Sequence, residues 1–103
     1  MQIEHQEAVA NIDDILKVDD IDVFFIGPSD LSQSMGFPGD PKAPPVARAI
    51  EATLARIVAA GKVPGMPATA EALPGVLAKG CRYVYNHLPR LIGAGAAQYL
   101  KSV

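Results

Sequence analysis

Residues 23–30, Val23-Phe24-Phe25-Ile26-Gly27-Pro28-Ser29-Asp30, decide how the chain folds. Four consecutive apolar residues followed at once by Gly-Pro are typical of a short strand that is covered on both faces, as in parallel sheets. The carboxylate of Asp30 comes soon after the predicted end of that strand. In parallel α/β folds, functional side chains gather at the carboxyl ends of the strands. Asp30 is therefore the first candidate site residue.

A helix is predicted upstream of this strand, and the end of another strand before that helix. Residues 5–18 repeat apolar side chains at the spacing of an amphipathic helix. The short segment Gln2-Ile3-Glu4 is interpreted as the last residues of a strand. Glu4 then ends one strand as Asp30 follows the next one, and neighbouring parallel strands would bring both carboxylates to the same rim.

The alternation of strands and helices continues downstream. Because strands separated by helices run parallel, the pattern predicts four parallel βα units. Pattern alone leaves two architectures open, a small open α/β sheet or half of an eight-unit barrel, which needs about 250 residues. The predicted segments are a proline-rich ordered loop at 27–45 with a turn of helix at 29–32, a helix at 45–60, a strand at 62–66, an interrupted helix at 69–79, a strand at 82–85 and a helix at 88–101.

Composition excludes several classes of protein. The chain has 103 residues, half of them apolar, and a formal net charge of −2, so it lacks the basic surface that nucleic acid requires. No apolar run approaches the roughly 20 residues of a membrane span. Cys81 is the only cysteine, which rules out an internal disulfide and fits a cytoplasmic protein.

Two carboxylates at one rim suit a hard divalent cation such as Mg²⁺ or Mn²⁺, which keeps open positions for water and substrate. A purely structural role fits the same residues. Asp30 could cap the start of a short helix, and Glu4 could be a first-turn acidic residue favoured by the helix dipole. From residue pattern alone both interpretations remain open.

Three segments closely resemble the HpcH/HpaI aldolase family: residues 2–16, residues 25–36 and residues 61–65. The resemblance covers almost the whole chain. It implies that residues 1–103 form a single partial domain, the C-terminal half of a (β/α)₈ TIM barrel of the phosphoenolpyruvate/pyruvate type. It also implies a metal-dependent carbon–carbon lyase that acts on 2-oxo acids and releases pyruvate or a relative.

The same resemblance assigns roles to individual residues. Glu4 and Asp30 match the metal ligands, with Mg²⁺ or Mn²⁺ as the cation and Co²⁺ as a further candidate. Gln2 and Ser29 match positions that contact the substrate, and Asp30 belongs to that substrate site as well. The implied small-molecule partners are a 2-oxo acid such as pyruvate and an aldehyde.

The resemblance places the catalytic histidine and arginine in an N-terminal half for which this sequence has no matching positions. His5 is expected to point away from the rim on its helix. His87 follows the last strand and could reach the rim, but a capping or surface position is the favoured interpretation. The alternative function is therefore a non-catalytic remnant or assembly domain that keeps the metal site. Because the first and last strands would expose unpaired edges, we expect a homo-oligomer or association with the missing half-barrel.

Overall fold

Four parallel strands form one sheet in the computed structural model, which describes residues 1–103. Each strand pairs with the next one along the chain, in the order β1-β2-β3-β4. This arrangement confirms the predicted four parallel βα units. The strands are β1 (Gln2–Ile3), β2 (Val23–Ile26), β3 (Val63–Pro67) and β4 (Tyr83–Tyr85).

The helices lie between the strands, with three departures from the expected boundaries. The helix expected over 5–18 is two short helices, because Asn11 interrupts it and asparagine favours helix ends over interiors. The loop expected at 27–45 begins with a seven-residue helix, which Pro28 opens at a position where its missing N–H costs nothing. The helix expected over 69–79 begins only at Leu73, so Pro74 and Gly75 lie in its first turn and do not interrupt it. The helices are α1 (Gln6–Ala10), α2 (Ile12–Ile15), α3 (Pro28–Ser34), α4 (Pro44–Ala59), α5 (Leu73–Ala78) and α6 (Leu88–Leu100).

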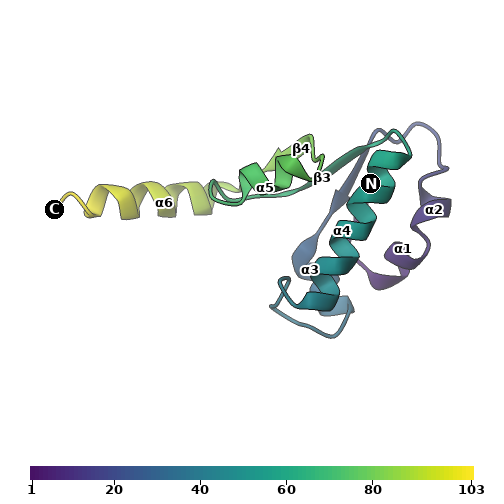
Figure 1. The fold of residues 1–103 in the computed structure, drawn as a ribbon. Helices are drawn as coiled ribbons and strands as arrows, with labels where there is room; N and C mark the ends of the chain where they lie inside the picture. Colours follow the sequence, from purple (N-terminus) through teal and green to yellow (C-terminus); the bar gives the residue numbers. More distant parts are fainter.

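The hydrophobic core lies between one face of the sheet and the helices. Phe24 and Ile26 alternate along β2 with less buried neighbours, and both are fully buried. Leu54 and Ile57 on the inner face of α4 belong to the same buried cluster. Figure 1 shows α4 lying along the sheet, with α1 and α2 beside it.

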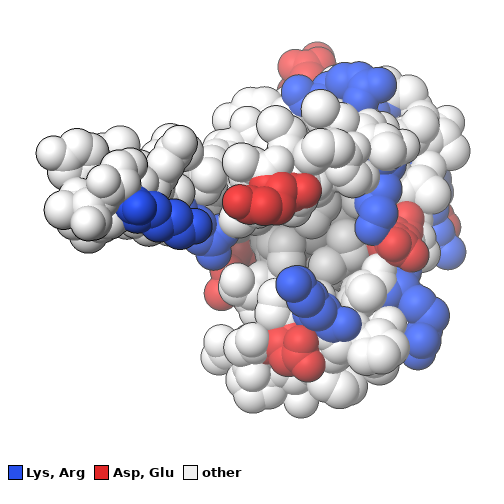
Figure 2. Space-filling view, turned by 60° about the vertical axis from the view of Figure 1, so that its left-hand side comes forward, with Lys and Arg blue, Asp and Glu red and all other residues white.

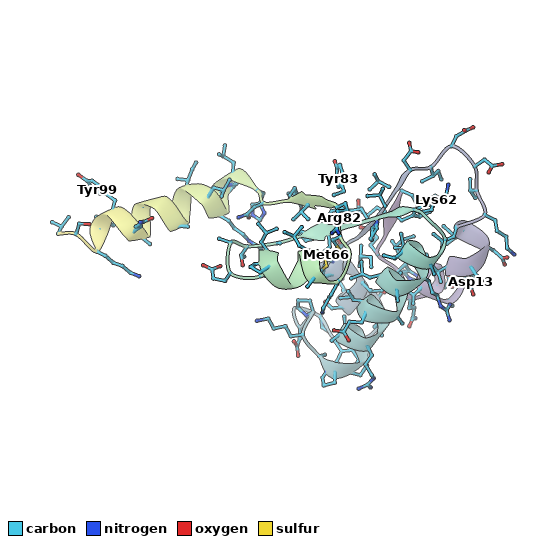
Figure 3. The ribbon with its side chains drawn as sticks, turned by 45° about the horizontal axis from the view of Figure 1, so that its top comes forward. Asp13, Lys62, Met66, Arg82, Tyr83 and Tyr99 are labelled. Carbon is cyan, nitrogen blue, oxygen red and sulfur yellow. The ribbon has the colours of Figure 1, made fainter.

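The opposite face of the sheet is not covered. Strand register aligns Gln2, Phe25, Gly65 and Tyr83 in one row across the four strands. Tyr83 is 54% exposed on this face, and it points away from the helical side on which Met66 lies (Figure 3). Within residues 1–103, the expected cover of the 23–26 strand is therefore present on one face only. The strand is apolar on both sides, but only one layer of helices is present.

Helix α6 projects away from the rest of the molecule, which gives the chain a length of 54 Å against a width of 29 Å (Figure 1). None of its residues is buried. Its apolar side chains face solvent, among them Leu88, Leu91, Ile92 and Tyr99. Figure 2 shows this projecting arm as a largely uncharged surface. No helix in the chain is both long and apolar enough to cross a membrane.

Candidate metal and substrate site

The first two strands bring their carboxyl ends to one rim of the sheet. Ile3 pairs with Ile26, and the Gly27 amide donates to the Ile3 carbonyl at 3.0 Å. Because side chains alternate along a strand, Gln2 and Glu4 flank the buried Ile3 and point to the uncovered face. Glu4 and Gly27, which directly follow β1 and β2, therefore lie side by side at this rim.

The side chains of Gln2 and Glu4 lie close to the backbone of Gly27. A Cβ atom at this position would lie 3.1 Å from Gln2 Nε2 and 3.3 Å from Glu4 Oε2. Glycine therefore allows a close approach here, and a larger residue would make the side chains of Gln2 and Glu4 shift by a few tenths of an ångström. The sequence places an amide and a carboxylate over the same peptide at the start of α3.

Asp30 lies in the first turn of α3, on the side that faces the connection between β1 and α1. The Gln6 amide donates to Ser34 Oγ at 3.0 Å, and Ser34 Oγ donates to the Leu31 carbonyl at 3.0 Å. Asp30 and Ser34 are four residues apart and share one face of the helix. The contact with Gln6 therefore holds the segment that carries Glu4 beside the face that carries Asp30.

Ser29 precedes Asp30 in the same helical turn and is exposed. The N–H groups of a helix's first turn lack acceptors within the helix. The second and third residues of α3 are Ser29 and Asp30, so their amides are available to an acidic ligand. Ser29 also supplies its carbonyl to the Ser32 hydroxyl at 2.7 Å, which steadies this turn.

Neither histidine joins the two carboxylates. His5 is the N-cap of α1, where Nδ1 accepts from the Glu7 amide at 3.3 Å. His87 is the N-cap residue of α6 and is exposed. No cluster of three or more His, Cys, Asp or Glu side chains exists that could hold a metal. Mg²⁺-type sites often use only one or two carboxylates and complete their coordination with water and substrate, so the donor chemistry of Glu4 and Asp30 is compatible with a divalent cation.

Sequence reasoning missed an aromatic group on the uncovered face. The rings of Phe25 and Tyr85 stack with centroids 5.6 Å apart, and Tyr83 meets Phe25 edge-to-face at 6.1 Å. These three rings line a hollow of about 570 Å³ together with Met1, Gln2 and Val23. The alternation of aromatic and aliphatic residues in Tyr83-Val84-Tyr85 was the available signal, since period two indicates one shared face.

Asn86 is a second residue that the sequence did not single out. It follows β4 directly and so lies at the same rim of the sheet as Glu4 and Gly27. Its Oδ1 atom is buried and accepts no hydrogen bond. Such an atom is unusual, because buried polar atoms nearly always have a partner.

Comparison with known proteins identifies the class to which this arrangement belongs. Residues 1–80 match the family model of HpcH/HpaI aldolase/citrate lyase. The chain therefore belongs to the HpcH/HpaI aldolase family, as the resemblance of its first 36 residues indicated.

Particular relatives agree with this membership. A 73-residue segment is 53% identical to the 4-hydroxy-2-oxo-heptane-1,7-dioate aldolase of Salmonella arizonae, covering 71% of this chain and 28% of that protein. An HpcH/HpaI aldolase/citrate lyase family protein from Burkholderia cenocepacia superimposes with a TM-score of 0.90 at 27% identity. An HpcH/HpaI aldolase from Desulfitobacterium hafniense gives a TM-score of 0.84 at 29% identity.

The chain covers only part of each of these proteins. It spans 28% of the curated aldolase and 40% of each of the two solved structures, while 98% of its own residues are superimposed. Its four βα units are therefore a portion of the TIM-barrel fold of these neighbours. The alternative of an unrelated small open sheet is excluded.

Proposed function

We propose that this chain carries the metal- and pyruvate-binding part of a class II aldolase, which cleaves a carbon–carbon bond in 2-oxo acids. The observation that supports this best is the position of the Gln2 and Glu4 side chains against the backbone of Gly27, beside the first turn of α3. Family membership supplies the reaction type. Residues 1–103 are treated as one partial aldolase domain.

In this proposal Glu4 and Asp30 hold a divalent cation, with Mg²⁺ or Mn²⁺ as the first candidates and Co²⁺ as a further one. Both side chains present hard oxygen ligands, and their elements are held together by the contact between Gln6 and Ser34. When bound, such a cation supplies Lewis-acid stabilisation of the negative charge that develops as the carbon–carbon bond breaks.

The remaining residues bind and orient the substrate. The side-chain amide of Gln2 lines the hollow on the uncovered face and would donate to an oxo acid. The first-turn amides of Ser29 and Asp30 would receive the substrate carboxylate, because a helix N-terminus favours an anion. Because the cation would supply the Lewis-acid stabilisation, the proposal needs no Schiff-base lysine. Of the lysines that follow β1 and β2, Lys17 pairs with Asp14, Lys62 donates to the Ile21 carbonyl and Lys42 is exposed.

The proton of the cleaved hydroxyl must pass to a base, and we place this base outside the residues named above. By family resemblance it is a histidine, accompanied by an arginine on the oxo group, and both belong to the part of the relatives that this chain does not span. Activity is therefore assigned to a complex with the missing half-barrel, because a homo-oligomer of these residues would not supply the histidine and the arginine. The chemistry and the free, buried Cys81 support a cytoplasmic location.

Titration with Mn²⁺, followed by electron paramagnetic resonance of the free ion, tests the metal site. Glu4→Gln and Asp30→Asn should each weaken binding by about tenfold or more, because each removes one of two charged ligands. Glu7→Gln and Asp19→Asn are matched controls that remove exposed carboxylates elsewhere and should bind like wild type. Equal affinity in all five proteins would remove the site.

Pyruvate release, coupled to lactate dehydrogenase, tests the reaction separately. The first substrate to try is 4-hydroxy-2-oxo-heptane-1,7-dioate, which the name of the Salmonella relative suggests. Release that requires Mn²⁺ and is lost in Glu4→Gln supports the aldolase. Intact Mn²⁺ binding without release under any assembly condition would instead establish the non-catalytic remnant.

A further inference from the structure

A second row of residues crosses the sheet at the rim that carries the proposed metal ligands. Pro67 pairs with Tyr85 in the register of β3 and β4. Glu4 and Gly27 continue the pairing of β1 with β2 by one residue, and a Cβ atom on Gly27 would lie 3.2 Å from Glu4 Cβ. Because residues two apart along a strand share one face, the row at this rim contains Glu4, Gly27, Pro67 and Tyr85.

Only the two ends of this row carry long side chains. Gly27 has no side chain, and the ring of Pro67 is short and bears no polar group. Glu4 at one end is a proposed metal ligand, and Tyr85 at the other end carries a large ring. The space above Gly27 and Pro67 therefore lies between a carboxylate and an aromatic ring.

The Tyr85 ring leans from β4 back across β3 toward β2. These outer two strands are two strand spacings apart, about 9–10 Å, yet the rings of Phe25 and Tyr85 stack with centroids 5.6 Å apart. Gly65 lies between them on β3 and allows this approach, because a Cβ atom there would lie 2.9 Å from Phe25 Cδ2. The Ala68 amide donates to the Tyr85 carbonyl at 3.0 Å, which fixes the backbone at the end of β4. The ring therefore has a defined position above β3.

Tyr85 and Gln2 line the same hollow. Gln2 is the residue proposed to donate to the 2-oxo acid, so the Tyr85 ring borders the space that this acid would enter. An acid held beside Glu4 by its carboxylate and oxo group would extend the rest of its carbon chain away from these atoms. Extension toward β3 and β4 meets the Tyr85 ring, and moving that ring aside would break its stacking on Phe25.

We propose that Tyr85 is a specificity-determining residue, which closes the substrate site on the β4 side and restricts the aldehyde part of the substrate to a short carbon chain. This inference rests on the proposed function, because it needs a 2-oxo acid bound beside Glu4. It assigns the exclusion of longer chains to the ring of Tyr85 and not to its hydroxyl. A 2-oxo acid with a short tail should therefore bind more tightly than one with a long tail.

Binding of unreactive 2-oxo acids to the Mn²⁺-loaded chain, followed by water-proton relaxation, tests this proposal. Pyruvate, 2-oxobutanoate and 2-oxoheptanoate share the carboxylate and the oxo group and differ only in the length of the tail. In the wild type, affinity should fall from 2-oxobutanoate to 2-oxoheptanoate. Tyr85→Ala should raise the affinity for 2-oxoheptanoate about tenfold or more, the effect of admitting at least one further methylene group. Its affinity for pyruvate should stay unchanged.

Two control variants separate the ring of Tyr85 from its hydroxyl and from its surroundings. Tyr85→Phe keeps the ring and should keep the selectivity of the wild type. Tyr83→Ala removes the other tyrosine of β4, which is also exposed and lies one row farther from the rim, and it should not admit the longer acid. Unchanged affinities for Mn²⁺ and pyruvate show that each variant retains its fold.

Equal affinity of the wild type and Tyr85→Ala for 2-oxoheptanoate would overturn the proposal. An equal gain in Tyr83→Ala or in Tyr85→Phe would overturn it as well. These results would leave the proposed function in place, because pyruvate binding would be intact. A wild-type chain that binds Mn²⁺ but not pyruvate would instead remove the proposed substrate site, and this inference with it.

Discussion

Gly65 is the residue at which a single added methyl group tests the architecture of the uncovered face. It lies in the centre of β3, between Phe25 on β2 and Tyr83 on β4. A Cβ here would approach the Tyr83 carbonyl oxygen to 2.7 Å and Phe25 Cδ2 to 2.9 Å. Gly65→Ala must therefore displace either the edge-to-face ring pair or the backbone of β4.

The expected cost can be estimated from the two opposing effects. Overpacking of this kind destabilises by about 1–3 kcal/mol, and replacing glycine recovers about 0.4–1 kcal/mol of unfolded-chain entropy. The net loss should be about 1–2 kcal/mol of unfolding free energy. With an m-value near 1 kcal/mol/M for a chain of this size, the urea midpoint should fall by about 1–2 M.

Urea unfolding followed by far-UV circular dichroism measures this change, and Gly75→Ala is its matched control. Gly75 lies within α5, and a Cβ there meets nothing within 4 Å. That variant should gain up to about 1 kcal/mol, as expected for alanine in a helix. If Gly65→Ala has an unchanged or higher midpoint, the close packing of Phe25 and Tyr83 across β3 is refuted.

Two further predictions concern pH. Burial raises the pKa of the Cys81 thiol against the opposing pull of Lys79 and Arg82. The thiol of the unfolded chain therefore loses its proton at lower pH than the folded one, and the free energy of unfolding should fall as pH rises above about 8.5. Cys81→Ala should flatten that decline in urea unfolding measured across alkaline pH. An equally steep decline in the variant would contradict the role of Cys81. The Lys79 ammonium, 2.7 Å from Glu51 Oε1, lowers the pKa of Glu51. The contribution of the Glu51 carboxylate to stability is present at neutral pH and is lost as pH falls below about 4. Glu51→Gln should therefore reduce the difference in unfolding free energy between neutral and acidic pH. Asp19→Asn is the charge-matched comparison and should leave that difference unchanged.

Local patterns in the sequence were sufficient to predict the elements and the rim. The apolar run before Gly27-Pro28 marked β2, and helical spacing marked α4. The boundaries that were wrong depended on single residues whose effect is decided by context. Asn11 could have continued a helix as readily as it ended one, and Pro28 is compatible with either a loop or the first turn of a helix.

The candidate site was predicted on a different kind of evidence. Gln2, Glu4 and Asp30 lie in segments that resemble a known family, so their identity did not have to be derived from pattern. The contacts between the elements that carry these residues could not be predicted from the sequence. The hydrogen bond from Gln6 to Ser34 joins residues 28 positions apart. The close approach of Gln2 and Glu4 to Gly27 forms only when β1 pairs with β2.

The uncovered face shows why a strand pattern cannot reveal what covers a sheet. Val23-Phe24-Phe25-Ile26 is apolar on both sides, which indicates two covering layers, yet the chain itself supplies only one. The family match ends at residue 80, and the segment beyond it contains both β4, which bears the exposed tyrosines, and α6, which has no contact surface of its own. The tyrosines of β4 and the apolar side chains of α6 are exposed to water, and such exposure does not contribute to the stability of the fold. Residues 81–103 therefore present apolar side chains that residues 1–80 do not cover, and a strand pattern alone does not say what would cover them.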